Sequence, residues 1–177
     1  MNHFRGSKYF SSLDLLSGYH QIPLSAASKE ITAFTTGEEL YQYTRLPFGL
    51  TNAPAAFSRL INIMMAGFSL DKAQTYLDYV LVAGFDFEDH LRNLQEVFAR
   101  LAKHGLKLNA SKCELFKQQV DYLGHEITQE GIKPVKTNIK AILEYPKPRT
   151  IKQVRQFNRI VNFFRKFLKN AVHLKPL

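Results

Sequence analysis

The sequence predicts an α+β fold in which helices cover one face of an antiparallel sheet. Strand-like runs alternate with helix-like runs in the order strand, hairpin, helix, strand, helix, strand. Two of the helix-like runs carry apolar residues at helical spacing. The chain of 177 residues is 45% apolar, which is enough for one domain with a small appendage and argues against disorder.

The first elements are a strand and a hairpin. Residues 9–16 (YFSSLDLL) form an apolar, β-prone run that residues 17–18 (Ser-Gly) interrupt, so we expect a mostly buried strand. Residues 31–36 and 40–46 are rich in β-branched and aromatic side chains and flank residues 37–39 (Gly-Glu-Glu). This pattern predicts a hairpin.

A loop and the first amphipathic helix follow. Residues 47–54 contain two prolines and a glycine, so we expect a loop there. Asn52 can cap a helix and Pro54 suits its first turn, so the helix is expected to run to about residue 66, where Gly67 stops it. Its apolar face consists of Phe57, Leu60, Ile61 and Met64.

The next segment is either a second buried strand or a tight hairpin. Residues 74–82 are β-prone and centred on Asp78, and the sequence leaves both options open. A second amphipathic helix then begins at Asp86 or at residues 88–89 and ends at Gly105. Its inward face is expected to consist of Leu91, Leu94, Val97, Phe98 and Leu101.

Two strands and two helices complete the expected elements. We expect strands at residues 106–109 and 119–128, the second kinked at Gly124, and helices at about residues 136–144 and 150–169. The apolar stripe of the last helix consists of Ile151, Val154, Phe157, Val161, Phe164 and Leu168.

The basic charge is concentrated at one end of the chain. Residues 1–132 contain 12 Lys and Arg against 14 Asp and Glu, whereas residues 133–177 contain 12 Lys and Arg against Glu144 alone. A mildly acidic body with a strongly basic end favours contact between that end and a polyanion, most simply nucleic acid. Charge alone leaves a solvated basic helix surface open as the alternative.

The composition disfavours several classes of protein. The single cysteine, Cys113, excludes an internal disulfide framework, and no Cys/His cluster has zinc spacing. No run reaches the ~18 apolar residues of a membrane helix, and the first residues lack a signal-peptide core. We therefore expect an intracellular protein, cytoplasmic or nuclear, with no membrane partner.

Two acids stand out because each lies in or beside a strand-forming run. Asp14 and Asp78 are separated by about sixty positions. A buried carboxylate is costly unless it is neutralised, and a divalent cation is a usual partner. Two such acids from different strands can hold metal ions for phosphoryl transfer. The plainer alternatives are a strand-end acid satisfied by backbone N–H groups for Asp14 and a turn residue for Asp78.

Five segments in order resemble the reverse transcriptase of gypsy-type LTR retrotransposons, and the resemblance covers nearly the whole chain. They are residues 9–22 (YFSSLDLLSGYHQI), 45–57 (RLPFGLTNAPAAF), 76–80 (YLDYV), 105–113 (GLKLNASKC) and 122–125 (YLGH). The third occupies the place of the Tyr-x-Asp-Asp box. The resemblance implies a polymerase palm with a ferredoxin-like antiparallel sheet over residues 1–132, and the basic helical start of a thumb over residues 133–177.

The resemblance also implies nucleotidyl transfer from deoxynucleoside triphosphates onto a primer 3′ end. Asp14 and Asp78 would bind Mg²⁺, or Mn²⁺ in its place, together with the backbone carbonyl of Leu15. Tyr19 would pack under the incoming sugar and crowd out a 2′-hydroxyl. An ordinary core aromatic is the alternative for Tyr19.

The remaining roles implied by the resemblance concern the nucleotide and the primer. Phe48 and Gly49 match residues that contact the nucleotide, and Lys112 matches a basic residue near the leaving pyrophosphate. Leu123 and Gly124 match the turn that grips the primer. The residues expected to follow the backbone of an RNA or DNA template–primer duplex are Lys152, Arg155, Arg159 and Lys166. A core aromatic for Phe48 and a solvated lysine for Lys112 are the alternatives.

Three departures from the family pattern predict weak or absent polymerase activity. Tyr79 stands where the box has its second acid, and a phenol with a pKa near ~10 cannot replace a carboxylate at pH 7. Most of the fingers and the RNase H segment of a parent polyprotein are expected to lie outside this sequence. Asn158 and Arg159 replace an expected Leu-Gly pair, so Arg159 should loosen packing or point to solvent.

Two further hypotheses compete with an impaired polymerase. One is a non-catalytic nucleic-acid-binding relic retained for its basic end. The other is an unstable product, because a palm without fingers exposes apolar surface. The sequence does not indicate an oligomeric state.

Overall fold

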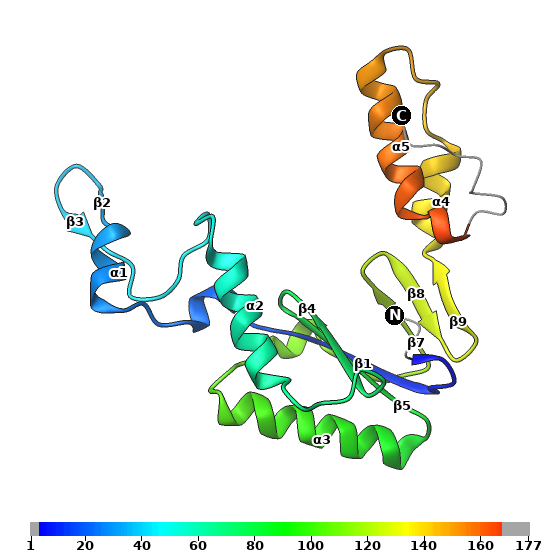
Figure 1. Ribbon diagram of the computed structural model, residues 1–177, viewed down its shortest axis with the longest axis horizontal. Coiled ribbons are helices and arrows are strands. Elements are labelled where there is room, and N and C mark those ends of the chain that lie inside the picture. Colours follow the sequence, from blue (N-terminus) through cyan, green and yellow to red (C-terminus); the bar gives the residue numbers. More distant parts are fainter. Residues whose placement is uncertain (1–3, 168–177) are drawn as a thin grey trace.

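The computed structural model describes residues 4–167 and has a larger and a smaller part (Figure 1). The larger part is built on four antiparallel strands, which are β1 (Tyr9–Asp14), β4 (Ala73–Tyr76), β5 (Tyr79–Gly84) and β6 (Glu114–Lys117). Their order in the sheet is β4-β5-β1-β6. Two helices pack on this sheet, so the α+β prediction is confirmed.

The two faces of this sheet carry two different apolar clusters. Side chains alternate between faces along a strand, and Leu13, Val80 and Val82 therefore share one face. They pack against α2 (Ala53–Met64) and α3 (Phe87–Lys103) in one buried cluster. The opposite face contributes a second cluster, which consists of Phe4, Phe10, Leu81, Ala83, Val120, Tyr122 and Ile127. The two central strands, β1 and β5, are therefore buried on both sides.

The segment around Asp78 is a tight hairpin rather than a single strand. Strands β4 and β5 pair from Ala73 opposite Val82 to Tyr76 opposite Tyr79, which leaves a two-residue turn. Leu77 in that turn has φ of 51°, a left-handed conformation that is uncommon for a residue other than glycine. The tighter of the two sequence-based options is therefore confirmed.

Helix α2 agrees with its sequence pattern. It begins at Ala53 with a proline in its first turn, although the Asn52 side chain makes no capping hydrogen bond. Phe57, Ile61 and Met64 are buried and Leu60 is half-buried against the same cluster. The 3.6-residue repeat of apolar side chains thus identified the buried face correctly.

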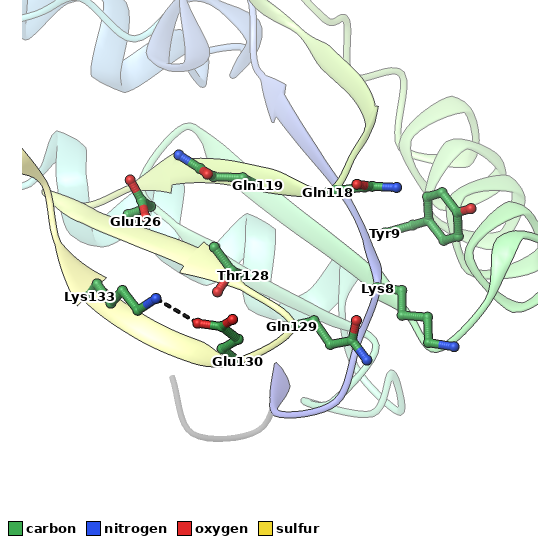
Figure 2. Close-up of a pocket in the computed structure, with 9 residues that line it drawn as sticks. All are labelled: Lys8, Tyr9, Gln118, Gln119, Glu126, Thr128, Gln129, Glu130 and Lys133. Atoms are coloured by element: carbon green, nitrogen blue, oxygen red, sulfur yellow. Dashed lines mark hydrogen bonds and ion pairs between the residues drawn. The ribbon is translucent and has the colours of Figure 1, made fainter.

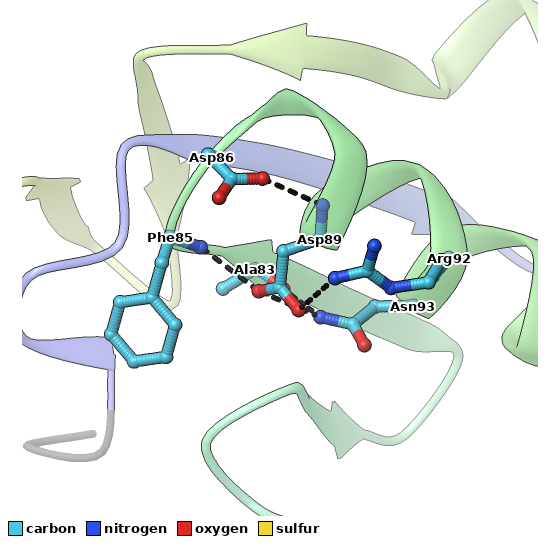
Figure 3. A network of polar contacts seen from close by, with 6 residues as sticks. All are labelled: Ala83, Phe85, Asp86, Asp89, Arg92 and Asn93. Carbon is cyan, nitrogen blue, oxygen red and sulfur yellow. Dashed lines mark hydrogen bonds and ion pairs between the residues drawn. The ribbon is translucent and has the colours of Figure 1, made fainter.

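A network of polar contacts fixes the start of α3 on the sheet (Figure 3). Asp86 caps the helix by accepting a hydrogen bond from the backbone N–H of Asp89 at 2.8 Å. Asp89 accepts one from the backbone N–H of Phe85 at 3.0 Å, and Asn93 donates to the carbonyl of Ala83 at 2.9 Å. The predicted inward position of Phe98 is wrong, because its side chain is 37% exposed at the edge of the stripe.

The segment between β1 and α2 contains a helix that the sequence did not predict. Ile31, expected in a strand, ends α1 (Ala26–Ile31), which Ser25 caps by accepting a hydrogen bond from Ser28 N. The expected hairpin is present but short, with β2 (Phe34–Thr35) paired to β3 (Leu40–Tyr41). After the serine cap come Ala26, Ala27, Lys29 and Glu30, all good helix formers, so the helix includes Ile31 despite its β-branched side chain.

The predicted strands after α3 need two corrections. Residues 106–109 make one isolated bridge, between Leu108 and Leu15, instead of a strand. The segment 119–128 is a hairpin of β7 (Gln119–Tyr122) and β8 (His125–Thr128) rather than one kinked strand. Two successive positive φ angles, 51° at Leu123 and 74° at Gly124, turn the chain back.

The smaller part continues from this hairpin into helices. Strand β9 (Gly131–Pro134) pairs with β8, so the boundary expected after residue 132 falls inside a strand. Helices α4 (Lys136–Leu143) and α5 (Ile151–Phe163) follow, and a Thr150–Gln153 capping box begins α5.

The long C-terminal helix was expected to reach about residue 169, but α5 ends at Phe163. One 3₁₀ turn, η4 (Arg165–Phe167), follows it, and Leu168 lies outside the described residues. Of the expected apolar stripe, Phe164 is buried, whereas Ile151 is exposed. Between residues 4 and 167, none of the helices is both long and apolar enough to cross a membrane.

Candidate active site

Asp14 and Asp78 lie at the same end of the four-stranded sheet. Asp14 is the last residue of β1 and lies opposite Tyr79, the first residue of β5. Asp78 immediately precedes Tyr79 in the β4–β5 turn, so it lies beside the end of β1. The backbone N–H of Leu15 donates to the carbonyl of Asp78 at 2.8 Å, which holds the turn against this strand end.

Asp14 lies on the sheet face opposite α2 and α3. Leu13 and Leu15 belong to the cluster under the helices, and the alternation along the strand directs Asp14 to the other side. Its cross-strand neighbour on that face is Tyr79. Asp14 is only 4% exposed, whereas Tyr79 is 42% exposed, so the tyrosine forms the outer wall of the carboxylate site.

The Tyr79 phenol interacts directly with Asp14. The negative charge of Asp14 raises the pKa of Tyr79, and desolvation, a hydrogen bond to Asp14 and the charge of Asp78 act in the same direction. Tyr79 is therefore a neutral hydrogen-bond donor at pH 7. It occupies one side of the carboxylate that the sequence identified as a metal ligand.

The residues present fit a hard divalent cation that receives its other ligands from substrate and water. Asp14 and Asp78 supply carboxylate oxygens, which Mg²⁺ and Mn²⁺ prefer, and Leu15 adds a nearby backbone carbonyl. Within residues 4–167, no group of three or more His, Cys, Asp or Glu side chains could hold a metal ion. The protein thus offers an open site with two carboxylates rather than a closed cage.

The Asp14 backbone connects this site to a distant loop. The carbonyl of Asp14 accepts a hydrogen bond from Asn109 N at 2.8 Å, and Asp14 N donates to Cys113 Sγ at 3.5 Å. Lys112 lies between these two partners at the end of a 3₁₀ turn, η3 (Ala110–Lys112), and its side chain is exposed. The structure therefore places Lys112 on a loop attached to the end of β1.

Tyr19, in the segment that follows β1, comes together with Phe48 on the side of the sheet that α2 covers. Their ring centroids are 4.9 Å apart, and the Tyr19 ring also contacts Phe57 of α2 at 5.6 Å. Gly18 is required here, because a Cβ atom at this position would lie 2.8 Å from the Phe57 ring. Phe48 is 59% exposed, so these rings form an accessible aromatic surface rather than a closed core.

Gly49 follows Phe48 in a left-handed conformation with φ of 92°, and a Cβ there would meet open space. Glycine is therefore needed for the backbone conformation at this position and not for close packing. The exposed peptide next to Phe48 is accessible to a ligand.

The Leu123–Gly124 turn is attached to the C-terminal helices. The carbonyl of Gly124 accepts hydrogen bonds from Asn138 Nδ2 at 3.3 Å and from Val135 N at 3.4 Å. The His125 ring lies 5.2 Å from the Phe163 ring of α5. Burial lowers the pKa of His125 and favours its neutral form, which suits this aromatic contact.

The basic residues of the last helices are accessible to solvent. Exposed side chains include those of Lys152, Arg155, Arg159 and Lys166. Arg159 lies with Asn158, Arg155 and Asn162 around a shallow polar depression. Of the two outcomes expected from the sequence, looser packing or a side chain that points to solvent, the structure shows the second. Within residues 4–167, none of the ion pairs between residues three or four positions apart involves these four side chains.

A polar hollow of about 410 Å³ lies between the start of β1 and the β7–β9 sheet (Figure 2). Its lining residues are Lys8, Tyr9, Gln118, Gln119, Glu126, Thr128, Gln129, Glu130 and Lys133. An ion pair of 2.7 Å between Lys133 and Glu130 spans part of it. None of the sequence-predicted site residues lines this hollow, so it is separate from the carboxylate site.

Sequence reasoning missed Gln21. This residue makes hydrogen bonds to Leu16 and Lys107 at the edge of the aromatic surface. Since Lys107 is 86 positions away, no local pattern could have identified the contact.

Known protein sequences are similar to this chain over most of its length. The model of a family described as "Reverse transcriptase (RNA-dependent DNA polymerase)" matches residues 1–127. The chain is 42% identical over 164 residues to the retrovirus-related Pol polyprotein from transposon 412 of Drosophila melanogaster, covering 93% of this chain and 13% of that polyprotein. It is 34% identical over 172 residues to the Pol polyprotein from transposon gypsy of the same organism, covering 97% and 17%. The chain thus spans less than a fifth of these relatives.

Solved structures give the same result. The foamy viral protease-reverse transcriptase in complex with double-stranded DNA is similar with a TM-score of 0.85 and 30% identity, over 94% of this chain and 29% of that chain. The same viral protein in complex with an RNA/DNA hybrid is similar with a TM-score of 0.76 and 30% identity, over 89% and 21%.

Proposed function

Because the chain belongs to the reverse transcriptase family of retrotransposon Pol polyproteins, we propose that it performs template-directed nucleotidyl transfer onto a primer 3′ end, in impaired form. The observation that carries this proposal is that Asp14 and Asp78 lie at the same end of two neighbouring strands. Two carboxylates from different strands provide the anionic oxygen ligands that phosphoryl transfer requires.

Reverse transcriptases generally use divalent metal ions, and Mg²⁺, with Mn²⁺ as the alternative, fits the two carboxylates. Asp14, Asp78 and the Leu15 carbonyl would hold it. When bound, such an ion stabilises negative charge on the attacking and leaving oxygens.

The other residues of the site would bind and orient the reactants. The exposed Tyr19–Phe48 surface would receive the sugar of the incoming nucleotide, with the accessible Gly49 backbone beside it. Lys112, on the loop attached to Asp14, would attract the pyrophosphate. Leu123 and Gly124 would position the primer end, since their turn is tied to the C-terminal helices.

A template–primer duplex is the proposed macromolecular partner. The foamy viral relatives were solved with double-stranded DNA and with an RNA/DNA hybrid. The exposed basic side chains of α5 and η4, which are Lys152, Arg155, Arg159 and Lys166, would follow its phosphates. This placement also accounts for the uneven charge of the chain.

Tyr79 is the proposed cause of impairment. A neutral phenol adds no charge to neutralise a cation, and as the cross-strand neighbour of Asp14 it would compete with metal for the carboxylate oxygens. Changes around a metal ligand typically cost about 10–100-fold in affinity or activity. We expect a loss at least this large, because an acid is missing as well.

The second candidate is a nucleic-acid-binding protein without catalysis. The observation in its favour is the contrast between the exposed basic side chains of α5 and the carboxylate site, where the cross-strand neighbour of Asp14 is a tyrosine and not a further acid. Binding through phosphates needs the basic side chains but no metal.

Primer extension on a homopolymer template separates the two candidates. We compare the chain with Tyr79→Asp, which restores an acid, and with Tyr79→Phe, which removes the hydroxyl without adding charge, in Mg²⁺ and in Mn²⁺. The proposal expects Tyr79→Asp to extend primers at least tenfold faster than the chain itself. If no variant incorporates nucleotide while all bind duplex with steep salt dependence, the enzyme proposal fails and the binding candidate stands.

A further inference from the structure

The side chain of Gln21 joins two segments that are distant in sequence. Gln21 ends a short 3₁₀ helix, η2 (Gly18–Gln21), and its Nε2 donates to the carbonyls of Leu16 at 2.7 Å and Lys107 at 3.0 Å. Its Oε1 accepts a hydrogen bond from the backbone N–H of Lys107 at 2.6 Å. The side-chain amide therefore pairs with both polar groups of Lys107, as a backbone residue would in a β-bridge.

The backbone of Gln21 holds a third segment. Its carbonyl accepts a hydrogen bond from Arg45 Nη1 at 2.9 Å. Next to this contact, Leu46 N donates to the carbonyl of Ile22 at 2.9 Å. These bonds fix the start of the segment that leads to Phe48, two residues after Leu46.

The same contacts close the loop that carries Tyr19. Leu16 and Gln21 are the ends of this loop, and the Gln21 amide bonds directly to Leu16. Leu16 N also donates to the carbonyl of Lys107 at 2.9 Å, so both ends are anchored to one residue. The Tyr19 ring then projects from a closed loop toward Phe48.

We propose that Gln21 is a positioning residue that fixes the Tyr19–Phe48 surface by tying together Leu16, Lys107 and Arg45. Gln21 does not touch the reacting atoms. Its effect on nucleotide selection rests on the proposed polymerase function, whereas its effect on the ring geometry does not. The amide is required because it offers a donor and an acceptor at once.

The key variant is Gln21→Glu, which keeps the shape but replaces the donor with an oxygen that faces two carbonyls. The matched control is Gln74→Glu, since Gln74 Nε2 makes a single exposed hydrogen bond, to the Leu70 carbonyl at 3.2 Å. Both substitutions add one negative charge, so they change the net charge of the chain equally. Gln21→Leu removes all the amide's bonds without adding charge.

The first measurement is structural and uses the full chain. Amide hydrogen exchange should become about tenfold faster at Lys107 in Gln21→Leu, because this variant lacks the oxygen that accepts from that N–H, whereas Gln21→Glu keeps an acceptor there and loses the donor. The proton–proton contacts between the Tyr19 and Phe48 rings in NMR spectra should weaken. The Gln74 variant should change neither. Unchanged exchange or unchanged ring contacts would overturn the proposal whatever the polymerase activity.

The second measurement tests selection in the Tyr79→Asp background. Gln21→Glu should raise KM for the deoxynucleotide and reduce the preference for deoxynucleotides over ribonucleotides several-fold, with kcat within about twofold. A fall in kcat alone, or altered ring contacts with unchanged KM and preference, would limit Gln21 to a structural role and refute positioning. If no variant polymerises, the proposed function fails, and the ring contacts alone decide whether Gln21 positions the surface.

Discussion

Replacing Gly84 with alanine tests how closely α3 packs on the sheet that carries the site. A Cβ atom at Gly84 would lie 2.5 Å from the backbone N and Cα of His90 and 2.6 Å from its Cβ. Carbon atoms in contact prefer about 3.5–4.0 Å, so the first turns of α3 must move by about 1 Å. The clash is with helix backbone and cannot be relieved by rotating a side chain.

Two costs follow from that movement. Overpacking a core costs about 1–3 kcal/mol. Moving the helix also stretches the buried 2.9 Å bond from Asn93 to the Ala83 carbonyl (Figure 3), and an unsatisfied buried carbonyl costs about 1–3 kcal/mol. The lower backbone entropy of unfolded alanine offsets up to ~1 kcal/mol. We therefore expect Gly84→Ala to lower the free energy of unfolding by about 3 kcal/mol, a large part of the ~5–15 kcal/mol typical of a domain.

Urea unfolding followed by circular dichroism measures this change, with Gly18→Ala as the control. The control makes the same substitution, so the entropy of the unfolded chain cancels in the comparison. Its new Cβ meets the edge of the Phe57 ring at 2.8 Å, and a ring can tilt where a helix backbone cannot. A loss below about 1 kcal/mol for Gly84→Ala, or a larger loss for Gly18→Ala, would refute the reasoning.

Three further predictions concern the metal ligand, the duplex and pH. Asp14→Asn should abolish any rise in melting temperature that Mg²⁺ and nucleotide cause together, and an unchanged rise would remove Asp14 from the metal site. Replacing Lys152, Arg155 and Arg159 by Ala should weaken duplex binding equally for all sequences and flatten the plot of log affinity against log salt by about 0.9 for each lost phosphate contact; no change in either would mean that this face is only solvated. Burial lowers the pKa of His90 in the folded chain. As the pH falls below ~6.5, His90 is therefore protonated in the unfolded chain before it is protonated in the folded chain. The contribution of this residue to stability should be complete above that pH and decline below it. His90→Gln should decline less over the same range in thermal unfolding, and identical profiles would contradict this assignment.

The parts of the fold that the sequence predicted correctly are those with strong local patterns. The apolar run of β1 and the apolar stripe of α2 each bury a regular set of side chains, so the spacing and type of the apolar residues were sufficient to predict both elements. Strand β6 was missed because its residues are largely exposed and show no alternation between apolar and polar. Helix α1 was missed because it is short and buries no side chain, so it has no apolar stripe, although its alanine, lysine and glutamate residues favour a helix.

The candidate site also has features that local sequence patterns predict and features that they do not. Its individual residues lie in short motifs and were identified from them, whereas the contacts among them depend on pairing between distant segments. Gln21 illustrates the limit, since an exposed-looking glutamine has no local feature that indicates a partner 86 positions away. A single register shift between strands would also have placed Asp14 and Tyr79 on opposite faces.

Strand register also changes the interpretation of Tyr79. From the sequence, this residue is a missing acid, and its effect is the loss of a ligand or of a supporting charge. The pairing of Asp14 with Tyr79 adds a second effect, because the phenol is the cross-strand neighbour of the carboxylate on the same face of the sheet. In the proposed function, the tyrosine is thus itself a competitor for Asp14. A phenol is already neutral at physiological pH, and the neighbouring acids raise its pKa further. The two carboxylates stabilise the very protonation state of Tyr79 that opposes their use as metal ligands.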